Sequence, residues 1–253
     1  MSRIPIALQM YTLRHEAQKD FAGTLRQVAE IGYAGVELAG CGSLTARELK
    51  TMLDDLGLKV AGSHVGFGRL EANVAEEIDF NLEIGSPYIV CPSIPEAKRT
   101  DEQTLRSTAE QLNRFGAICQ EHGLGFCYHN HSFEFTTKFG GRILLDLLYE
   151  ITDPQLVQAE IDVYWAQYAG YDPAALIRRH AGRCPLIHLK DMAGDAERSF
   201  VEVGEGILNF DAIFTASEAA GVQWYIVEQD ACQRPPLDSI RISLDNLKAR
   251  GKV

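Results

Sequence analysis

The sequence has no long apolar run and few signs of a secreted protein or a zinc ribbon. Nowhere in the 253 residues do about 18 apolar residues follow one another, so we expect no membrane span. The first residues, MSRIPIALQMYTLRHE, lack the long apolar stretch of a signal peptide. The six cysteines are scattered without a CxxC pair, and we interpret them as reduced, mostly buried side chains. These absences predict a soluble cytoplasmic protein.

Basic residues are also in short supply. Lys and Arg number 24 against 35 Asp and Glu, which gives a formal net charge of −11. A protein that binds nucleic acid by neutralising phosphates needs a basic face, so we expect no nucleic-acid partner. The apolar fraction of 46% supports a large core and excludes a wholly disordered chain. No Ser/Gly linker, charge block or low-complexity stretch divides the chain.

Short apolar runs recur along the whole sequence. Each is rich in Val, Ile, Leu or aromatic residues and is bounded by Gly, Pro or polar residues, which is typical of buried parallel strands. The eight runs are Ile4–Met10, Gly35–Leu38, Lys59–Val65, Tyr88–Cys91, Gly125–His129, Val157–Val163, Pro185–Leu189 and Trp224–Glu228. We therefore predict eight strands.

Amphipathic segments with helix-end signals lie between these runs. The clearest are Phe21–Ile31, Ser43–Leu56, Asp101–Glu121, Asp172–His180 and Asp211–Ala220. Eight strands alternating with about eight helices predict a single-domain α/β protein, a (β/α)8 TIM barrel over residues 1–253. An open doubly wound sheet also alternates, but it would usually carry a Gly-rich phosphate loop after strand 1. The segment Gln9–Arg14 at that place has no glycine.

Polar side chains gather at the predicted C-terminal ends of the strands, where barrel enzymes place their active sites. The set comprises Gln9, Tyr11, Glu37, His64, Tyr128–His131, Glu134, Glu160, Asp162, His188, Lys190, Asp191 and Glu228–Asp230. Buried carboxylates without partners cost several kcal/mol, and a bound divalent cation would remove this cost. A mixed carboxylate and imidazole set suits Mn²⁺, Co²⁺, Mg²⁺ or Zn²⁺.

Several of these residues also have an ordinary structural interpretation. Glu160 could be a deep side chain paired with Lys190 or a histidine, and Asp191 and Asp230 could cap the helices that follow. Glu37 could be a helix cap or an ion-pair partner, and His64 could simply form a hydrogen bond across the barrel mouth. We expect the remaining histidines at the surface, namely His15, His122 and His180.

In their order along the chain, the strand-end motifs resemble one known superfamily. The motifs are Leu8–Leu13 (LQMYTL), Gly35–Leu38 (GVEL), Ser63-His64, Tyr128–Phe135 (YHNHSFEF), Glu160–Trp165 (EIDVYW), His188–Asp191 (HLKD), Val203–Gly206 (VGEG) and Ile226–Glu228 (IVE). Together they cover nearly the whole chain. They resemble the xylose isomerase-like sugar (phosphate) isomerase/epimerase superfamily of TIM barrels, with relatives such as ketose 3-epimerase, hydroxypyruvate isomerase and inosose dehydratase.

The resemblance implies one divalent metal ion held by two glutamates, one aspartate and one histidine. The aspartate carries over to Asp162, the histidine to His188 and the last glutamate to Glu228. Many epimerases carry the first glutamate directly on strand 5, where this chain has His129 or Asn130. Relatives that share a histidine-rich strand 5 supply it a few residues later, so the resemblance points to Glu134, with His131 as the fallback ligand. Mn²⁺ is the favoured ion, ahead of Mg²⁺, Co²⁺ and Zn²⁺.

The resemblance also implies a chemistry for these residues. Glu134 and Glu228 would remove and return a proton next to a carbonyl, through an enediolate. Lys190 and His131 would polarise the substrate oxygen or transfer a proton. The substrate-binding side chains would be Gln9, Glu37, His64, His129 and Trp165.

The leading functional hypothesis is a metal-dependent isomerase or epimerase of carbohydrate metabolism, acting on a small sugar or polyol. The alternative is a dehydratase or lyase/hydrolase acting on a keto-inositol or 3-keto-glycoside, which the Tyr128–His131 strand mildly favours. An endonuclease-IV-like DNA repair enzyme is disfavoured by the net charge. A barrel that only binds a ligand is disfavoured while four candidate metal ligands are present. The sequence leaves open the substrate, the metal and whether the protein forms a homo-oligomer.

Overall fold

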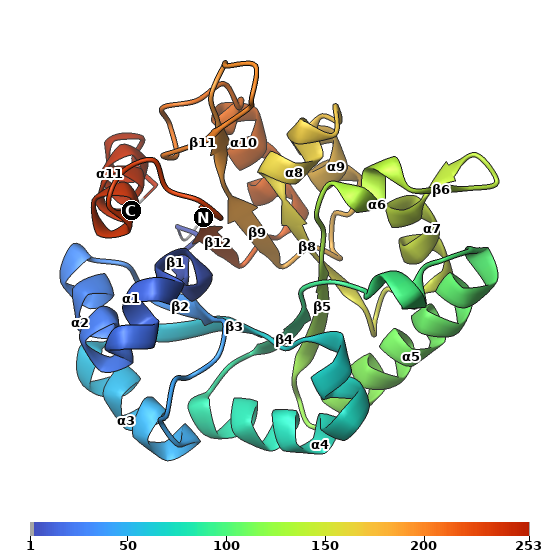
Figure 1. Ribbon diagram of the computed structural model, residues 1–253, viewed down its shortest axis with the longest axis horizontal. Coiled ribbons are helices and arrows are strands. Elements are labelled where there is room, and N and C mark those ends of the chain that lie inside the picture. The colour runs from blue at the N-terminus through green and yellow to red at the C-terminus, as the bar shows by residue number, and fades with distance from the viewer. Residues whose placement is uncertain (1–2, 253) are drawn as a thin grey trace.

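The computed structural model describes residues 3–252, and within them eight parallel strands close into a barrel (Figure 1). The strands follow one another around the barrel in the order β1-β12-β9-β8-β5-β4-β3-β2. Their bounds are β1 Ile6–Gln9, β2 Gly35–Leu38, β3 Lys59–His64, β4 Tyr88–Cys91, β5 Gly125–His129, β8 Gln158–Asp162, β9 Leu186–Leu189 and β12 Trp224–Val227. Each lies within one of the eight predicted runs, so the predicted TIM barrel is confirmed.

Helices connect the strands and cover the outside of the barrel (Figure 1). Those predicted from the sequence are α2 (Phe21–Ile31), α3 (Ala46–Leu56), α5 (Glu102–Glu121), α9 (Pro173–Arg179) and α10 (Phe210–Ala220). The start of α3 shows why the sequence signal was strong. Thr45 accepts a hydrogen bond from the backbone N–H of Glu48, whose side chain in turn accepts one from the backbone N–H of Thr45. The same helix ends at Gly57, whose φ of 69° favours glycine.

The structure adds helices that the sequence signals did not delimit. The longer ones are α4 (Phe67–Ile84), α7 (Leu144–Ile151) and α11 (Pro236–Ala249), and the shorter ones are α1 (Arg14–Lys19), α6 (Phe133–Thr136), α8 (Val163–Tyr168) and the 3-10 turns η1 (Met10–Leu13) and η2 (Glu96–Lys98). Asn73 interrupts α4 with a non-helical backbone, which breaks its periodicity. In α7 five of the eight residues are buried, and its polar face consists of only Asp146 and Glu150, one turn apart.

Two small hairpins lie outside the barrel. Strands β6 (Lys138–Phe139) and β7 (Arg142–Ile143) pair antiparallel, as do β10 (Asp191–Met192) and β11 (Phe200–Val201). The second hairpin follows the end of β9 directly and extends the chain beside the C-terminal ends of the strands (Figure 1).

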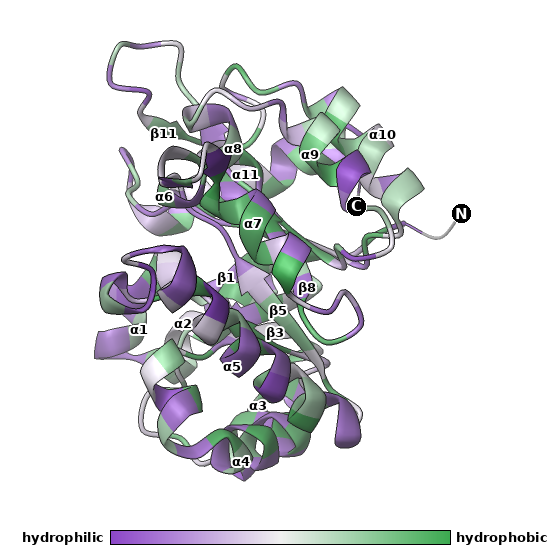
Figure 2. Cartoon of the chain, turned by 90° about the vertical axis from the view of Figure 1, so that its right-hand side faces the viewer, coloured by the Kyte–Doolittle hydropathy of each residue, from purple (hydrophilic) through white to green (hydrophobic). Residues whose placement is uncertain are grey.

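Apolar side chains fill the space between the helices and the barrel, and a smaller cluster fills the N-terminal end of the barrel itself. Figure 2 shows hydrophobic and hydrophilic colour mixed on the outer helices. The inner cluster comprises Ala7, Ala61, Tyr88, Val90, Cys127, Leu186, Trp224 and Ile226. All six cysteines are free, and four are buried, as predicted. Within residues 3–252, no helix combines the length and apolar character needed to cross a membrane.

The strand register decides which polar residues meet at the other end of the barrel. Gln9 is level with Glu37, and His129 is level with Glu160. One step further along, Asp162 is level with His188. Because side chains alternate between the two faces of a strand, these pairs form successive layers inside the barrel.

Candidate active site

Buried polar residues form a deep layer just above the apolar cluster. Glu37, at the end of β2, accepts hydrogen bonds from Gln9 Nε2 and His188 Nε2, each at 2.7 Å. It also lies 3.1 Å from Nε2 of His64, which comes from β3. Gly62 leaves room for Glu37, since a Cβ at this position would lie 2.7 Å from Oε1 of the carboxylate.

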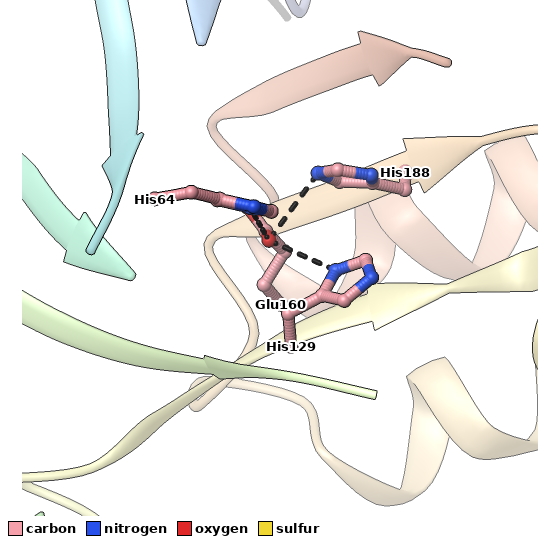
Figure 3. Close-up of side chains that lie close together, drawn as sticks. All are labelled: His64, His129, Glu160 and His188. Carbon is pink, nitrogen blue, oxygen red and sulfur yellow. Dashed lines mark hydrogen bonds and ion pairs between the residues drawn. The ribbon is translucent and has the colours of Figure 1, made fainter. Parts of the chain in front are cut away.

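Glu160 is the centre of this layer (Figure 3). Its Oε2 lies 2.8 Å from His64 Nε2, 3.0 Å from His129 Nδ1 and 3.2 Å from His188 Nε2. The sequence left open whether Glu160 pairs with Lys190 or with a histidine. The structure shows Glu160 paired with histidines, while Lys190 pairs with other carboxylates. We name Glu37 and Glu160, with His64 and Gln9, the deep layer.

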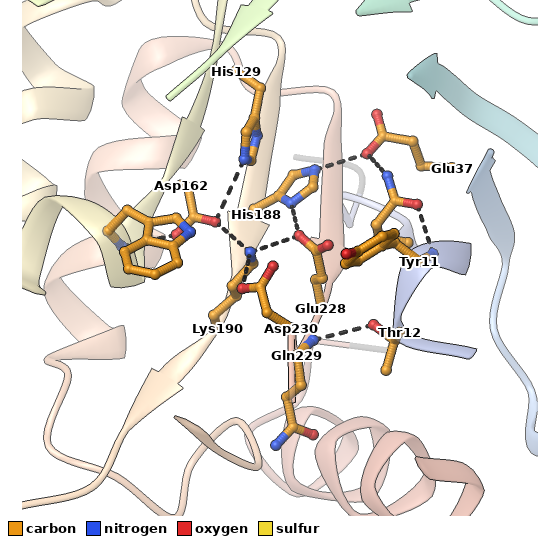
Figure 4. Close-up of polar contacts among 12 residues, drawn as sticks. Tyr11, Thr12, Glu37, His129, Asp162, His188, Lys190, Glu228, Gln229 and Asp230 are labelled. Carbon is orange, nitrogen blue, oxygen red and sulfur yellow. Dashed lines mark hydrogen bonds and ion pairs between the residues drawn. The ribbon is translucent and has the colours of Figure 1, made fainter. Parts of the chain in front are cut away.

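Four donor groups converge one step above the deep layer (Figure 4). They come from the ends of four neighbouring strands, and one ligand atom from each lies within 4.8 Å of the others. The four are His129 on β5, Asp162 on β8, His188 on β9 and Glu228 just after β12. His129 Nε2 lies 3.8 Å from Asp162 Oδ2, and His188 Nδ1 lies 2.7 Å from Glu228 Oε2. All four are buried, and we call them the ligand group.

The ligand group fits a divalent cation. Two imidazole nitrogens and two carboxylates are the donor types that Zn²⁺ and Mn²⁺ accept in proteins. Asp162 Oδ2 is buried and forms no hydrogen bond, although Lys190 Nζ lies 3.0 Å away as an ion partner. The other oxygen of Asp162 accepts a hydrogen bond from the backbone N–H of Trp165, which fixes the carboxylate at the start of α8. A buried carboxylate oxygen that accepts no hydrogen bond and is balanced only by charged neighbours is free to bind a cation.

Lys190 is a buried cation beside the ligand group. Its Nζ lies 3.0 Å from Asp162, 2.8 Å from Glu228 and 2.7 Å from Asp230. Burial alone would lower the pKa of Lys190, but these three carboxylates raise it well above its usual value. Lys190 therefore stays positively charged at neutral pH. The pKa of Asp162 is raised to about 6 by burial, although Lys190 opposes the shift.

A cavity of about 350 Å³ opens above the ligand group. It is lined by Tyr11, Ala39, His64, Pro92, His129, His131, Lys190, Glu228 and Asp230. Trp165 stands beside it, with its ring centre 6.0 Å from that of His131 and 5.8 Å from Lys190 Nζ. The cavity is thus polar and charged on its floor, with aromatic side chains at its edge.

The sequence prediction placed Gln9 and Glu37 among the substrate-binding residues. The structure places both beneath the cavity, with no exposed surface and with their polar atoms bonded to each other and to histidines. Of the other residues proposed to contact substrate or carry out catalysis, His64, His129, His131, Lys190 and Glu228 do line the cavity.

Glu134 is the main departure from the predicted site. The sequence prediction placed Glu134 among the metal ligands. In the part of the chain that the structure describes, the ligand group contains His129 instead of Glu134. The short helix α6 turns Glu134 back toward strand β5, where it accepts hydrogen bonds from Tyr128 Oη and from the backbone N–H of His131, each at 2.7 Å. Burial raises the pKa of Glu134 to about 7. His131, the fallback ligand, presents its ring to the cavity and also stays outside the group.

Residues 25–250 match the family model of the xylose isomerase-like TIM barrel. The chain belongs to this family. A curated relative, the inosose dehydratase of Geobacillus kaustophilus (strain HTA426), is 29% identical over 245 residues, which cover 81% of this chain and 79% of the relative. The inosose dehydratase of Clostridium beijerinckii (strain ATCC 51743 / NCIMB 8052) is 24% identical over 84% of this chain and 83% of its own length.

Solved structures of the family have the same architecture. A sugar phosphate isomerase/epimerase from Parabacteroides distasonis ATCC 8503 superposes with a TM-score of 0.83 at 27% identity and covers 100% of this chain and 96% of its own. The IOLI protein, whose structure has a binding zinc atom, superposes with a TM-score of 0.78, covering 98% of each chain. At 12% identity that second likeness shows the shared fold alone.

Two aspartates that we considered as helix caps have other partners in this family member. Asp191 accepts hydrogen bonds from the backbone N–H groups of Gly204, Gly206 and Leu208, so it holds the loop that contains the VGEG motif. Asp230 pairs with Lys190 at the edge of the cavity.

The prediction for surface histidines holds for two of the three. His15 and His122 are exposed. For His180 the prediction is wrong. The residue is 7% exposed and packs against Tyr149, with ring centres 4.7 Å apart. It directly follows α9, ahead of strand β9.

Proposed function

We propose that the protein is a divalent-metal-dependent lyase that dehydrates a cyclic keto-polyol of the inosose class. The observation that carries the proposal is the buried ligand group at the floor of a cavity of about 350 Å³, beside a buried lysine. The curated relatives support the reaction class, because they are named inosose dehydratase and align over more than four-fifths of this chain. A keto-polyol is also small enough for a cavity of this size.

The metal would be held by the four members of the ligand group, His129, Asp162, His188 and Glu228. Mn²⁺ is our first candidate, and Mg²⁺, Co²⁺ and Zn²⁺ are the alternatives. When bound, such an ion supplies a Lewis acid for the substrate carbonyl. The charged neighbours of Glu228 keep it in the form that binds a metal ion. Burial raises the pKa of Glu228, but Lys190 and His188 outweigh burial and lower it, so the carboxylate is ionised at neutral pH.

His131 is the proposed general base. It lines the cavity, and within residues 3–252 its Nδ1 has no hydrogen-bond partner. Burial and the positive charge of Lys190 lower the pKa of His131 to about 4, so the ring is unprotonated at pH 7, the form that a general base requires. Glu134, which we predicted to share this role, does not line the cavity and has both oxygens engaged.

The dehydration can be written with these two side chains. His131 takes the proton from the carbon next to the carbonyl, and the electron pair of the broken C–H bond moves into an enolate. The ammonium of Lys190 stabilises the negative charge on the enolate oxygen. The enolate then reforms the carbonyl and expels the hydroxyl from the next carbon. His131 returns its proton to that hydroxyl, so one water leaves and both side chains recover their starting state.

A sugar isomerase or epimerase is the second candidate. It shares the first step, and the observation that favours it is the 27% identity to the sugar phosphate isomerase/epimerase structure over the whole chain. The two reactions separate after proton removal, because an isomerase returns the proton to carbon and a dehydratase returns it to a leaving hydroxyl. The substrate is a small molecule in either case. We keep as predictions that no nucleic acid binds and that the protein is cytoplasmic.

The product formed in deuterated water tests the proposal. The protein would be loaded with Mn²⁺ and incubated separately with keto-inositols, 3-keto-glycosides and ketoses, and the products would be analysed by mass spectrometry. We expect a keto-inositol to give a product that is lighter by one water. A product of unchanged composition that carries solvent deuterium on carbon would instead establish the isomerase or epimerase. No turnover of any keto-polyol would overturn the dehydratase.

A further inference from the structure

His129 and His188 each face two buried sites at once. His129 directs Nε2 toward Asp162 in the ligand group and Nδ1 toward Glu160 in the deep layer, at 3.0 Å. His188 directs Nδ1 toward Glu228 and Nε2 toward Glu37, both at 2.7 Å. The two rings therefore link the ligand group to the carboxylates below it (Figures 3 and 4).

We propose that Glu37 and Glu160 are positioning residues that decide which ring nitrogen of His188 and His129 faces the metal. A neutral imidazole has one protonated nitrogen and one lone pair. A carboxylate that accepts from one nitrogen fixes the proton there and leaves the lone pair on the other. In this way Glu160 would turn the lone pair of His129 Nε2, and Glu37 that of His188 Nδ1, toward the ligand group. The inference rests on the proposed metal site.

The deep layer could also be taken for a second cation site, because one ligand atom from each of His64, His129, Glu160 and His188 lies within 4.8 Å of the others. Shared histidines argue against this. A second ion would need the lone pairs of His129 Nδ1 and His188 Nε2, while the first ion needs those on the opposite nitrogens. Both rings would then have to lose both protons. Glu160 and Glu37, which lie outside the ligand group, are 3.0 and 2.7 Å from these two nitrogens and accept from them, whereas Glu228, 2.7 Å from His188 Nδ1, would itself bind the first ion.

Other side chains keep the two carboxylates in place. His64 Nε2 lies between them, 2.8 Å from Glu160 and 3.1 Å from Glu37. Gln9 donates to Glu37 from the other side, and Gly62 leaves the space that the Glu37 carboxylate occupies. Both carboxylates are fully buried, so neither can contact a substrate in the cavity above. Their role must act through the two histidines.

Metal affinity tests the inference without any measurement of turnover. Zn²⁺ would be titrated into apo-protein in competition with a chromophoric chelator, for the wild type, Glu160→Gln and Glu37→Gln. We expect one Zn²⁺ per chain in the wild type and a loss of about 10–100-fold in affinity in each variant, the usual effect of removing such an outer acceptor. We also expect the absorption bands of Co²⁺-loaded protein to change in both variants, which reports directly on the ligand geometry.

Glu202→Gln is the matched control. Glu202 is likewise a buried glutamate, but it pairs with Ser239 and Arg234 away from the barrel interior. Its substitution should leave Zn²⁺ affinity and the Co²⁺ spectrum unchanged. If one of the two test variants fails to fold, the other decides the question, and Gly62→Ala provides a third route because its new Cβ would displace Glu37.

Unchanged or tighter Zn²⁺ binding in the folded variants would overturn the inference. Two equivalents in the wild type, with one lost in Glu160→Gln, would also overturn it, because the deep layer would then be a second cation site. The outcome is separable from that of the proposed function. Weaker binding in the variants of a protein that dehydrates no keto-polyol would uphold the positioning role and reject the dehydratase.

Discussion

The two ends of the barrel interior are built from the same strands but hold opposite kinds of side chain. At the N-terminal end, Cys127 of β5 and Leu186 of β9 belong to an apolar cluster. Two residues further along these strands, His129 and His188 belong to the ligand group. Burial alone stabilises the apolar end, whereas each polar group at the other end needs a specific partner. The apolar end therefore contributes to stability alone, whereas the polar end carries the chemistry and is stable only through its pairing.

The charged end is held by pairing within the protein. Glu37 and Glu160 are matched by histidines, and Lys190 is matched by three carboxylates. Among residues 3–252, the buried carboxylate oxygens at this end of the barrel that lack a hydrogen bond belong to Asp162 in the ligand group and to Glu37 and Glu160 in the deep layer. Substitutions at the charged end should therefore change metal binding and catalysis, and those at the apolar end should change stability alone.

The largest effect is expected from His131→Gln at the cavity. Loss of the proposed general base should lower kcat by about 10²–10⁴-fold. Because the ring is outside the ligand group, Zn²⁺ affinity should stay within a few-fold of the wild type. Steady-state kinetics on the keto-polyol and a metal titration would check both. A variant with wild-type kcat would remove His131 from the mechanism.

Lys190→Met should reduce the stability of the apo-protein most. The substitution leaves Asp162 and Glu228 buried without their cation, and breaking a buried ion pair in this way costs about 3–5 kcal/mol. Added Mn²⁺ should recover part of the loss, because the metal would neutralise the same carboxylates. Urea unfolding with and without Mn²⁺ measures this. Lys98→Met is the control, since the Lys98–Glu71 pair is partly exposed and should contribute little.

Leu186→Ala tests the apolar end. Leu186 is fully buried in the inner cluster, so the cavity left behind should lower the free energy of unfolding by about 2–5 kcal/mol. Zn²⁺ affinity of the folded variant should not change. A loss of affinity comparable to that in Glu160→Gln would show that the two ends are coupled and would weaken the comparison.

The smallest effect is expected from Glu134→Gln, and it depends on pH. The folded-state pKa of Glu134 is raised to about 7, so its protonated form is favoured on folding. The stabilisation is fully present below the unfolded-state pKa of roughly 4.3 and is lost as pH rises through about 7. Glutamine does not titrate. The unfolding free energy of the wild type relative to the variant should therefore fall by up to roughly 3 kcal/mol between pH 4.5 and 7.5. A pH-independent difference would contradict this.

The fold was predictable because each barrel strand is a short apolar run with clear ends. The ligand group was only partly predictable. Asp162, His188 and Glu228 follow from the resemblance, but the choice between His129 and Glu134 depends on the register of β5 against β8, which places His129 level with Glu160. Strand alternation shows which residues face inward, but the depth at which residues of neighbouring strands meet appears only in the closed barrel.

Metal removal tests the central claim most directly. The purified protein would be dialysed against a chelator until its metal content is negligible, and keto-inositol dehydration would be measured before and after Mn²⁺ is restored. We predict that activity falls to background in the metal-free protein and returns with one equivalent of Mn²⁺ per chain. A metal-free protein that dehydrates its substrate at the full rate would contradict the account.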